Sequence, residues 1–147
     1  MKNIILFVLL PLLSLAANPR DSYRMCLSAS NKLESPADRD AEKINCFNQG
    51  RAKKSVDLCL NLARVLEHTT SSDTLVVGCI NDNIFKMKMD ECVATAKKLN
   101  YSDTRDRALW TCLENISVKR SRCKAITDEM TFPHNRNIGL NYCLSKN

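Results

Sequence analysis

The sequence predicts an all-α protein, built as a tandem array of four disulfide-stapled antiparallel helical hairpins, that is, a short α-solenoid. Eight cysteines form four pairs with nineteen residues between the members of each pair, and the gaps between pairs are twelve, twelve and ten residues. Only three glycines occur, and no segment shows the sustained period-two alternation that strands require. The pairs are Cys26/Cys46, Cys59/Cys79, Cys92/Cys112 and Cys123/Cys143.

The amino-terminal residues have the pattern of an export signal. Lys2 supplies a positive start, residues 4–13 are an apolar run, and Ser14-Leu15-Ala16 is a small-x-small cleavage sequence. The run is too short for a stable transmembrane helix, which disfavours the alternative of a retained membrane anchor. We expect residues 1–16 to be a signal peptide and residues 17–147 to form a single helical repeat domain without a transmembrane segment. Its four units are expected at about residues 21–50, 51–85, 86–117 and 118–147.

Export accounts for the cysteines, because disulfides persist in oxidising compartments. We therefore expect a secreted or periplasmic protein in which all eight cysteines form disulfides. Zinc binding is the alternative, but the sequence contains no Cys-x-x-Cys or His-x-His spacing. The sequence predicts neither a metal site nor a cofactor.

Each unit has the pattern of two helices. Small or apolar residues recur three, four and seven positions after the first cysteine, which is one face of a helix. At offset four they are Ser30, Ala63, Ala96 and Thr127, and at offset seven Leu33, Leu66, Leu99 and Met130. Breaks follow at Ser35-Pro36, Thr70-Ser71-Ser72, Ser102-Asp103 and Thr131-Phe132-Pro133, where the polar residues are expected to cap the second helix.

The second helices carry a recurring polar residue and a thin apolar stripe. The polar residue falls in the first turns, where a carboxylate suits the positive end of the helix dipole. These residues are Asp40, Asp73, Asp106 and Asn137. Because aromatic residues are few, we expect a lean core of aliphatic residues and cysteines together with Phe47, Phe85 and Trp110.

Two disulfide schemes fit the hairpin geometry. In the first, each pair closes the end of its own hairpin opposite the turn. In the second, Cys46–Cys59, Cys79–Cys92 and Cys112–Cys123 join neighbouring units across the connecting loops. The invariant nineteen-residue spacing favours the first scheme, because a clamp between packed helices tolerates insertions less well than a loop does.

The period and the two-helix unit resemble helical solenoids of the tetratricopeptide and Sel1-like kind, including cysteine-stapled exported versions. The resemblance spans about residues 20–147 and includes a small residue and Leu on the first helix, with Pro36 or Pro133 near the turn. It implies an architecture and carries over no functional residue.

Basic residues gather where each unit begins, and a stack would align them along one edge. An anionic partner is one interpretation of this edge, and a solvated surface is the other. The candidate anion-binding residues are Arg51, Lys53, Lys54, Lys86, Lys88, Lys119, Arg120 and Arg122. No aromatic residues alternate with them as stacking platforms, which disfavours nucleic acid as the partner.

The sequence predicts no catalytic residues. His68 and His134 lie near turns in different units and are expected to be lone surface histidines, and no phosphate-binding or nucleophile signature is present. We expect a non-enzymatic binding or scaffold module for a protein or another ligand. The alternatives are a cationic binder of anionic membrane lipid or glycan, a secreted effector, or a structural spacer. The two main hypotheses differ in salt dependence, because charge-driven binding weakens with added salt.

Overall fold

The computed structural model describes residues 19–49 and 55–145, so the expected signal peptide lies outside the described residues. Within these two segments the chain forms eight α-helices and no strand, which confirms the all-α prediction. The helices are α1 (Pro19–Ser30), α2 (Pro36–Gln49), α3 (Val56–Ala63), α4 (Thr69–Asn83), α5 (Met89–Ala96), α6 (Ser102–Asn115), α7 (Arg120–Asp128) and α8 (Pro133–Ser145). None of the described helices is long and apolar enough to cross a bilayer.

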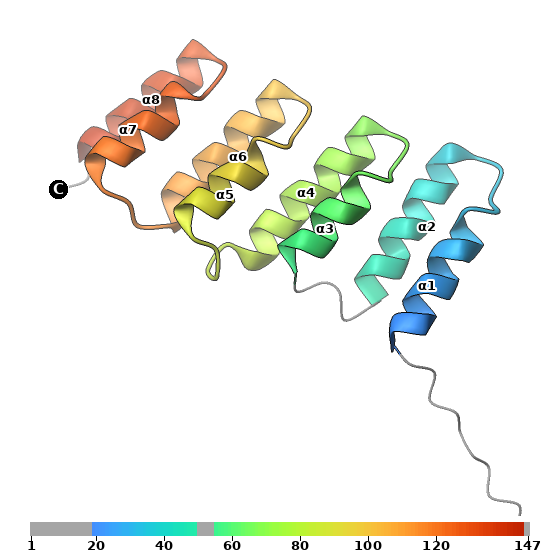
Figure 1. Ribbon diagram of the computed structural model, residues 1–147. Coiled ribbons are helices and arrows are strands. Elements are labelled where there is room, and N and C mark those ends of the chain that lie inside the picture. The colour runs from blue at the N-terminus through green and yellow to red at the C-terminus, as the bar shows by residue number, and fades with distance from the viewer. Residues whose placement is uncertain (1–18, 50–54, 146–147) are drawn as a thin grey trace, which may run out of the picture.

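The helices pack in consecutive pairs, which we number one to four along the chain. Figure 1 shows the pairs side by side in chain order, with the short turns within pairs along one edge and the connections from α4 to α5 and from α6 to α7 along the other. Each helix contacts its own partner most extensively, and contacts between pairs are made largely by α2, α4 and α6.

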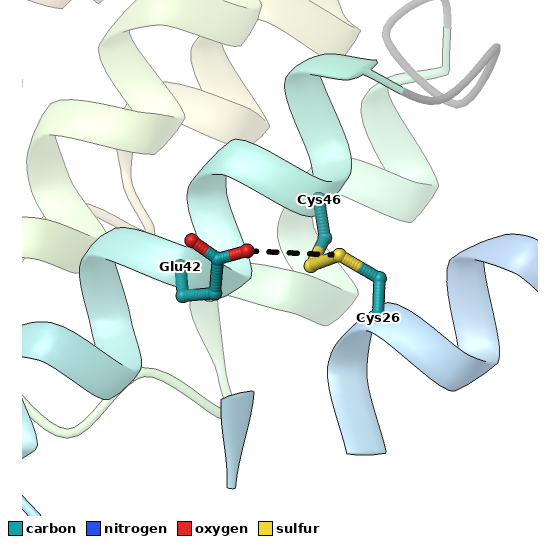
Figure 2. A group of neighbouring side chains, drawn as sticks. All are labelled: Cys26, Glu42 and Cys46. Atoms are coloured by element: carbon teal, nitrogen blue, oxygen red, sulfur yellow. Dashed lines mark hydrogen bonds between the residues drawn. A yellow bond between two sulfur atoms is a disulfide. The ribbon is translucent and has the colours of Figure 1, made fainter. Parts of the chain in front are cut away.

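One disulfide joins the two helices of each pair. The bridges are Cys26–Cys46, Cys59–Cys79, Cys92–Cys112 and Cys123–Cys143, with Cα–Cα distances between 5.7 and 6.3 Å. This is the first of the two schemes considered above, and the first of these bridges is drawn in Figure 2. Four disulfides fit an oxidising, extracellular environment.

Small residues allow the two helices of a pair to approach closely. The four residues at the fourth position after the first cysteine are all buried, namely Ser30, Ala63, Ala96 and Thr127. Gly139 of α8 lies against Thr127 of α7, and a Cβ at Gly139 would collide with the Thr127 methyl group. By contrast, a Cβ at Gly78 of α4 would meet no atom within 4 Å.

Large apolar side chains are exposed in both of the end pairs. At the seventh position after the first cysteine, Leu99 and Met130 are 3% and 1% exposed, whereas Leu33 of the first pair is 40% exposed. At the other end, Leu144 of α8 is 60% exposed. The prediction that Phe85 belongs to the core is wrong, because its side chain is 88% exposed in the connection between α4 and α5.

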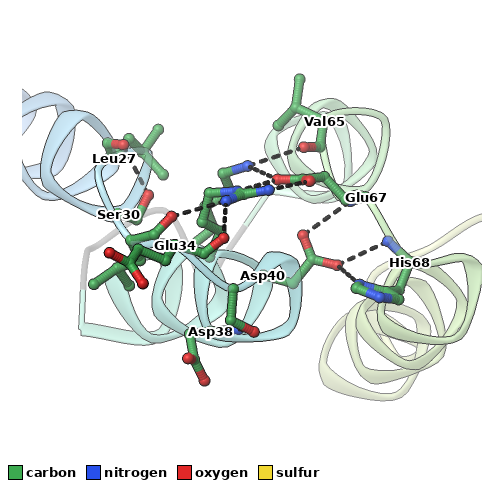
Figure 3. Close-up of polar contacts among 12 residues, drawn as sticks. Leu27, Ser30, Glu34, Asp38, Asp40, Val65, Glu67 and His68 are labelled. Carbon is green, nitrogen blue, oxygen red and sulfur yellow. Dashed lines mark hydrogen bonds and ion pairs between the residues drawn. The ribbon is translucent and has the colours of Figure 1, made fainter.

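Three buried carboxylates connect successive pairs. Asp40 of α2 accepts hydrogen bonds from the backbone N–H groups of Glu67 and His68, at 2.8 and 2.9 Å, in the turn of the second pair (Figure 3). Asp73 of α4 and Asp106 of α6 bind the turns of the third and fourth pairs in the same way. Each carboxylate therefore fixes the position of the following turn, a role beyond the helix-dipole effect predicted for it.

These carboxylates also explain why two of the predicted caps are wrong. Ser35 does precede α2, and its hydroxyl accepts from the N–H of Asp38 at 3.4 Å. The predicted caps of α4 and α6 lie inside those helices instead. The N-cap residues are His68 and Tyr101, and neither makes a side-chain cap hydrogen bond. At both turns the preceding pair supplies a carboxylate from outside the local sequence.

Candidate functional site

The predicted basic edge lies on the connections between pairs. Lys86 and Lys88 fall between α4 and α5, and Lys119, Arg120 and Arg122 lie at or just before the start of α7. All five side chains are exposed. Arg51, Lys53 and Lys54 lie outside the described residues, so this part of the edge stays a prediction.

The structure neutralises part of this positive charge. Arg122 forms an ion pair with Asp90 of the preceding pair, and the Arg120 guanidinium donates to the carbonyl oxygen of Leu144 at 3.0 Å. Lys86, Lys88 and Lys119 have no carboxylate partner within ion-pair distance among the residues the structure describes. In the described part of the edge, these three lysines form no ion pair, and Arg120 is bound only to a neutral carbonyl oxygen.

A small hollow between the third and fourth pairs is a second candidate site. Its volume is about 170 Å³. The lining residues are Asp103, Asp106, Arg107, Trp110, Met130, Asn135 and Ile138. Pockets for small-molecule ligands usually enclose about 300–1,000 Å³, so this hollow suits a single side chain of a partner better than a cofactor.

Apolar walls and a charged rim define the hollow. Trp110 of α6 is held by an edge-on contact with Tyr142 of α8, with 5.1 Å between ring centroids. Ile138 of α8 is 43% exposed and forms part of the opposite wall. At the rim, the carboxylate of Asp103 pairs with the Arg107 guanidinium at 2.6 Å. The arrangement can hold an apolar side chain while presenting both signs of charge around it.

The base of the hollow is the buried Asp106. Its carboxylate accepts from the backbone N–H groups of Thr131 and Phe132 and from the Asn135 side-chain amide, at 2.8 to 3.1 Å. These bonds occupy both carboxylate oxygens, so Asp106 holds the fourth pair in place. It is poorly placed to act as a free base or a metal ligand.

His68 is exposed, as predicted, but it does not stand alone. Its Nδ1 lies 3.2 Å from the Asp40 carboxylate, which also accepts the backbone N–H groups of Glu67 and His68. Burial alone would raise the pKa of Asp40, but these hydrogen bonds and the His68 ring outweigh burial and lower that pKa below its usual value. Asp40 is therefore a structural anion, bound by the backbone N–H of Glu67 and by both the backbone N–H and the ring of His68.

One cluster of potential metal ligands occurs in the described segments: Cys26, Glu42 and Cys46, drawn in Figure 2. Both sulfur atoms belong to the disulfide, so neither can act as a thiolate ligand in the oxidised protein. The Glu42 carboxylate lies 4.0 Å from the Cys26 sulfur, which carries no thiol proton to donate. Metal binding by this cluster would require reduction of the disulfide.

The junction carboxylates and the hollow were not predicted as sites. A signal for the carboxylates was present, because Asp40, Asp73 and Asp106 recur six residues before the second cysteine of their pairs. The N–H groups that donate to them lie in the next unit, so the periodicity within one helix cannot reveal these hydrogen bonds. Comparisons with protein-family models, curated proteins and solved structures find no match to this chain.

Proposed function

We propose that this chain is an exported, non-catalytic binding or scaffold module. Its four stapled hairpins form a short α-solenoid that presents a rigid surface to a protein or peptide partner. Two features support rigidity: a disulfide within each pair and a buried carboxylate at each junction between pairs. Preorganised surfaces of this kind lose little conformational entropy on binding.

The observation that carries the proposal is the hollow between α6 and α8. It exposes Trp110 and Ile138 to solvent, flanked by the Asp103–Arg107 pair. Aromatic and aliphatic side chains in a small depression with a polar rim are typical of protein interfaces. No described residue of the chain itself fills this space.

The test is affinity capture of partners from the exported protein fraction, by the wild type and by Ile138→Asp. The variant places a charge in the hollow at a residue already 43% exposed, so the fold should tolerate it. Val65→Asp is the matched control, because Val65 is 56% exposed and does not line the hollow. Capture that survives Val65→Asp and physiological salt but not Ile138→Asp supports the proposal. Equal capture by both variants contradicts it.

A second candidate is a cationic binder of anionic surfaces, either membrane lipid or glycan. It is favoured by the three exposed lysines of the connecting edge that have no carboxylate partner among the described residues. Binding to heparin or anionic vesicles should then be strong at low salt and should fall steeply with added salt. The triple change of Lys86, Lys88 and Lys119 to glutamate should abolish it. Persistence of binding in this variant would exclude these three lysines as the contact.

A further inference from the structure

The last helix leaves uncovered a surface that the earlier pairs bury. Helices α2, α4 and α6 each have two buried side chains on this surface, at most 7% exposed. One lies three residues before the second cysteine of its pair, and the other lies one residue after it. These are Lys43, Phe47, Val76, Ile80, Leu109 and Leu113. In α8 the same positions are Leu140, which is partly exposed, and Leu144, which is 60% exposed. With Arg136 and Asn137 they form what we call the C-terminal end face.

A broad hollow of about 610 Å³ lies on this face. It is lined by Arg120, Ser121, Lys124, Leu140, Cys143 and Leu144. The fourth pair lies at one end of the row that the described helices form (Figure 1). Leu140 and Leu144 make the lining of the hollow apolar, and Arg120 and Lys124 place positive charge beside them.

Arg136 at this face repeats a residue that joins the first two pairs. Arg39, seven residues before the second cysteine of its pair, binds the carbonyl oxygens of its own turn. It also donates two hydrogen bonds to the Glu67 carboxylate of the next pair, at 2.6 and 2.7 Å (Figure 3). Arg136 has the same position in the fourth pair and donates to the carbonyl oxygen of Met130 in its own turn at 2.8 Å. Its Nε is buried and has no hydrogen-bond partner in the described part of the chain. Arg136 therefore binds its own turn as Arg39 does, but it has no carboxylate partner among the described residues equivalent to Glu67.

A carboxylate at the position equivalent to Glu67 is exposed at the opposite end of the row. Glu34, in the turn of the first pair, lies eight residues after its first cysteine, as Glu67 does in the second pair. Its side chain is exposed and forms no ion pair with any described residue. With Ala29, Lys32 and Leu33, which are also exposed, Glu34 forms what we call the N-terminal end face.

A second interior ion pair gives the same match. Lys97 of the third pair binds Glu129 of the fourth pair at 2.6 Å. The equivalent positions at the two ends are Asp128 in the fourth pair and Lys32 in the first, both exposed and again of opposite sign. Two ion pairs that hold interior junctions together thus have complementary halves on the two end faces.

We propose that a second copy of this chain docks its N-terminal end face on the C-terminal end face, head to tail. Arg136 would pair with Glu34 of the second copy, and Asp128 with its Lys32, while Leu140 and Leu144 become covered. This interaction goes beyond the proposed function and uses other residues than the hollow between α6 and α8. Because the two faces differ, the contact is heterologous and does not end at a dimer, so copies add head to tail into open chains or rings.

The junction between copies is weaker than the interior junctions. Asn137 stands where Asp40, Asp73 and Asp106 stand, and its single carbonyl oxygen is neutral, whereas a carboxylate offers two charged acceptors. Ala29 occupies the position where the later pairs bury Leu62, Thr95 and Ile126, so less apolar surface is covered. Assembly should consequently be reversible and should weaken with added salt.

The test is sedimentation velocity of the oxidised exported protein, over a wide concentration range and at low and high salt. We expect species larger than dimers to accumulate with concentration at low salt. Arg136→Glu and Glu34→Arg should each weaken association at least about tenfold, because each places like charges together. The double variant restores opposite charges and should recover most of the association. Lys86→Glu is the control for charge change away from both end faces.

Three results would overturn the proposal. The first is a wild type that remains monomeric at every concentration. The second is a double variant no better than the single variants. The third is association that stops at dimers and is indifferent to Glu34→Arg, which indicates pairing of two C-terminal end faces. Ile138→Asp should leave assembly unchanged, so failure of this proposal and failure of the proposed function are distinguishable.

Discussion

Replacing Asp73 by asparagine tests how strongly the junction carboxylates hold the helix pairs together. The Asp73 side chain is 3% exposed and accepts hydrogen bonds from the backbone N–H groups of Asn100 and Tyr101 and from the Asn100 side-chain amide. The distances are 2.8 to 3.1 Å. Asparagine keeps one acceptor oxygen, loses the charge, and turns an NH₂ group towards donors that need an acceptor.

The magnitude follows from the number of bonds lost. Hydrogen bonds to a charged group contribute about 1.5–3 kcal/mol each, and the substitution removes or weakens at least two. Asn100 and Tyr101 are exposed, so water can replace part of the loss. We expect Asp73→Asn to lower the free energy of unfolding by about 3 kcal/mol, which corresponds to a fall in Tm of about 10 °C for a domain of this size.

The assay is urea unfolding with the disulfides intact, followed by circular dichroism and Trp110 fluorescence. Asn137→Asp is the matched control, because it makes the reverse exchange at the same position of the last pair, where the side chain is exposed and binds no following turn. Its effect should stay within about 0.5 kcal/mol. Equal effects of the two substitutions, or an unchanged stability of Asp73→Asn, would refute the role assigned to the junction carboxylates.

Three further predictions concern other parts of the chain. Gly78→Ala should stabilise the protein by about 0.5–1 kcal/mol, because the position is helical and a Cβ would meet no other atom. Gly139→Ala should destabilise the protein, because a Cβ would collide with Thr127 where α7 and α8 are in close contact. Chemical denaturation measures both effects. The difference in unfolding free energy between wild type and Asp40→Asn should be constant above about pH 5 and should shrink as the pH falls below about 4. The reason is that a carboxyl group with a lowered pKa stabilises the folded protein only while it is ionised. A constant difference down to the lowest pH at which both proteins fold would contradict this. Under limiting dithiothreitol, the Cys26–Cys46 disulfide should be reduced first, because Cys26 is partly exposed while the other bridges are buried. Peptide mapping of alkylated thiols measures the order in which the four disulfides are reduced. Earlier reduction of a buried bridge would show that solvent access does not govern the rate.

The cysteine spacing was sufficient to predict much of the architecture. A constant separation of nineteen residues around a midway turn places both cysteines at the same level of an antiparallel hairpin, and the structure has all four bridges within pairs. The small residues four positions after the first cysteine were also correctly placed on a buried face, and Thr127 lies against Gly139 of its partner helix.

The sequence did not reveal the contacts between neighbouring helix pairs. Local rules placed the caps of α4 and α6 at hydroxyl residues near the turn, but carboxylates from the preceding pair bind there instead. Phe85 was assigned to the core by its apolar character alone, yet its connection carries it into solvent. The hollow at Trp110 depends on how two pairs meet, and no periodicity within one unit encodes that contact.

The disulfides and the carboxylates stabilise different parts of this molecule. A disulfide holds two helices of one pair together even when the chain unfolds, so it restricts the unfolded state but adds no contact between pairs. A single short hairpin buries too little apolar surface to be stable alone, and a repeat array gains stability from its interfaces. The three interior interfaces each contain one buried aspartate, whereas the exposed end of α8 has a neutral asparagine at that position. The strongest interfaces are therefore those that keep the four pairs folding as one unit. The weaker residues at the end face allow a contact that can form and dissociate without unfolding the protein.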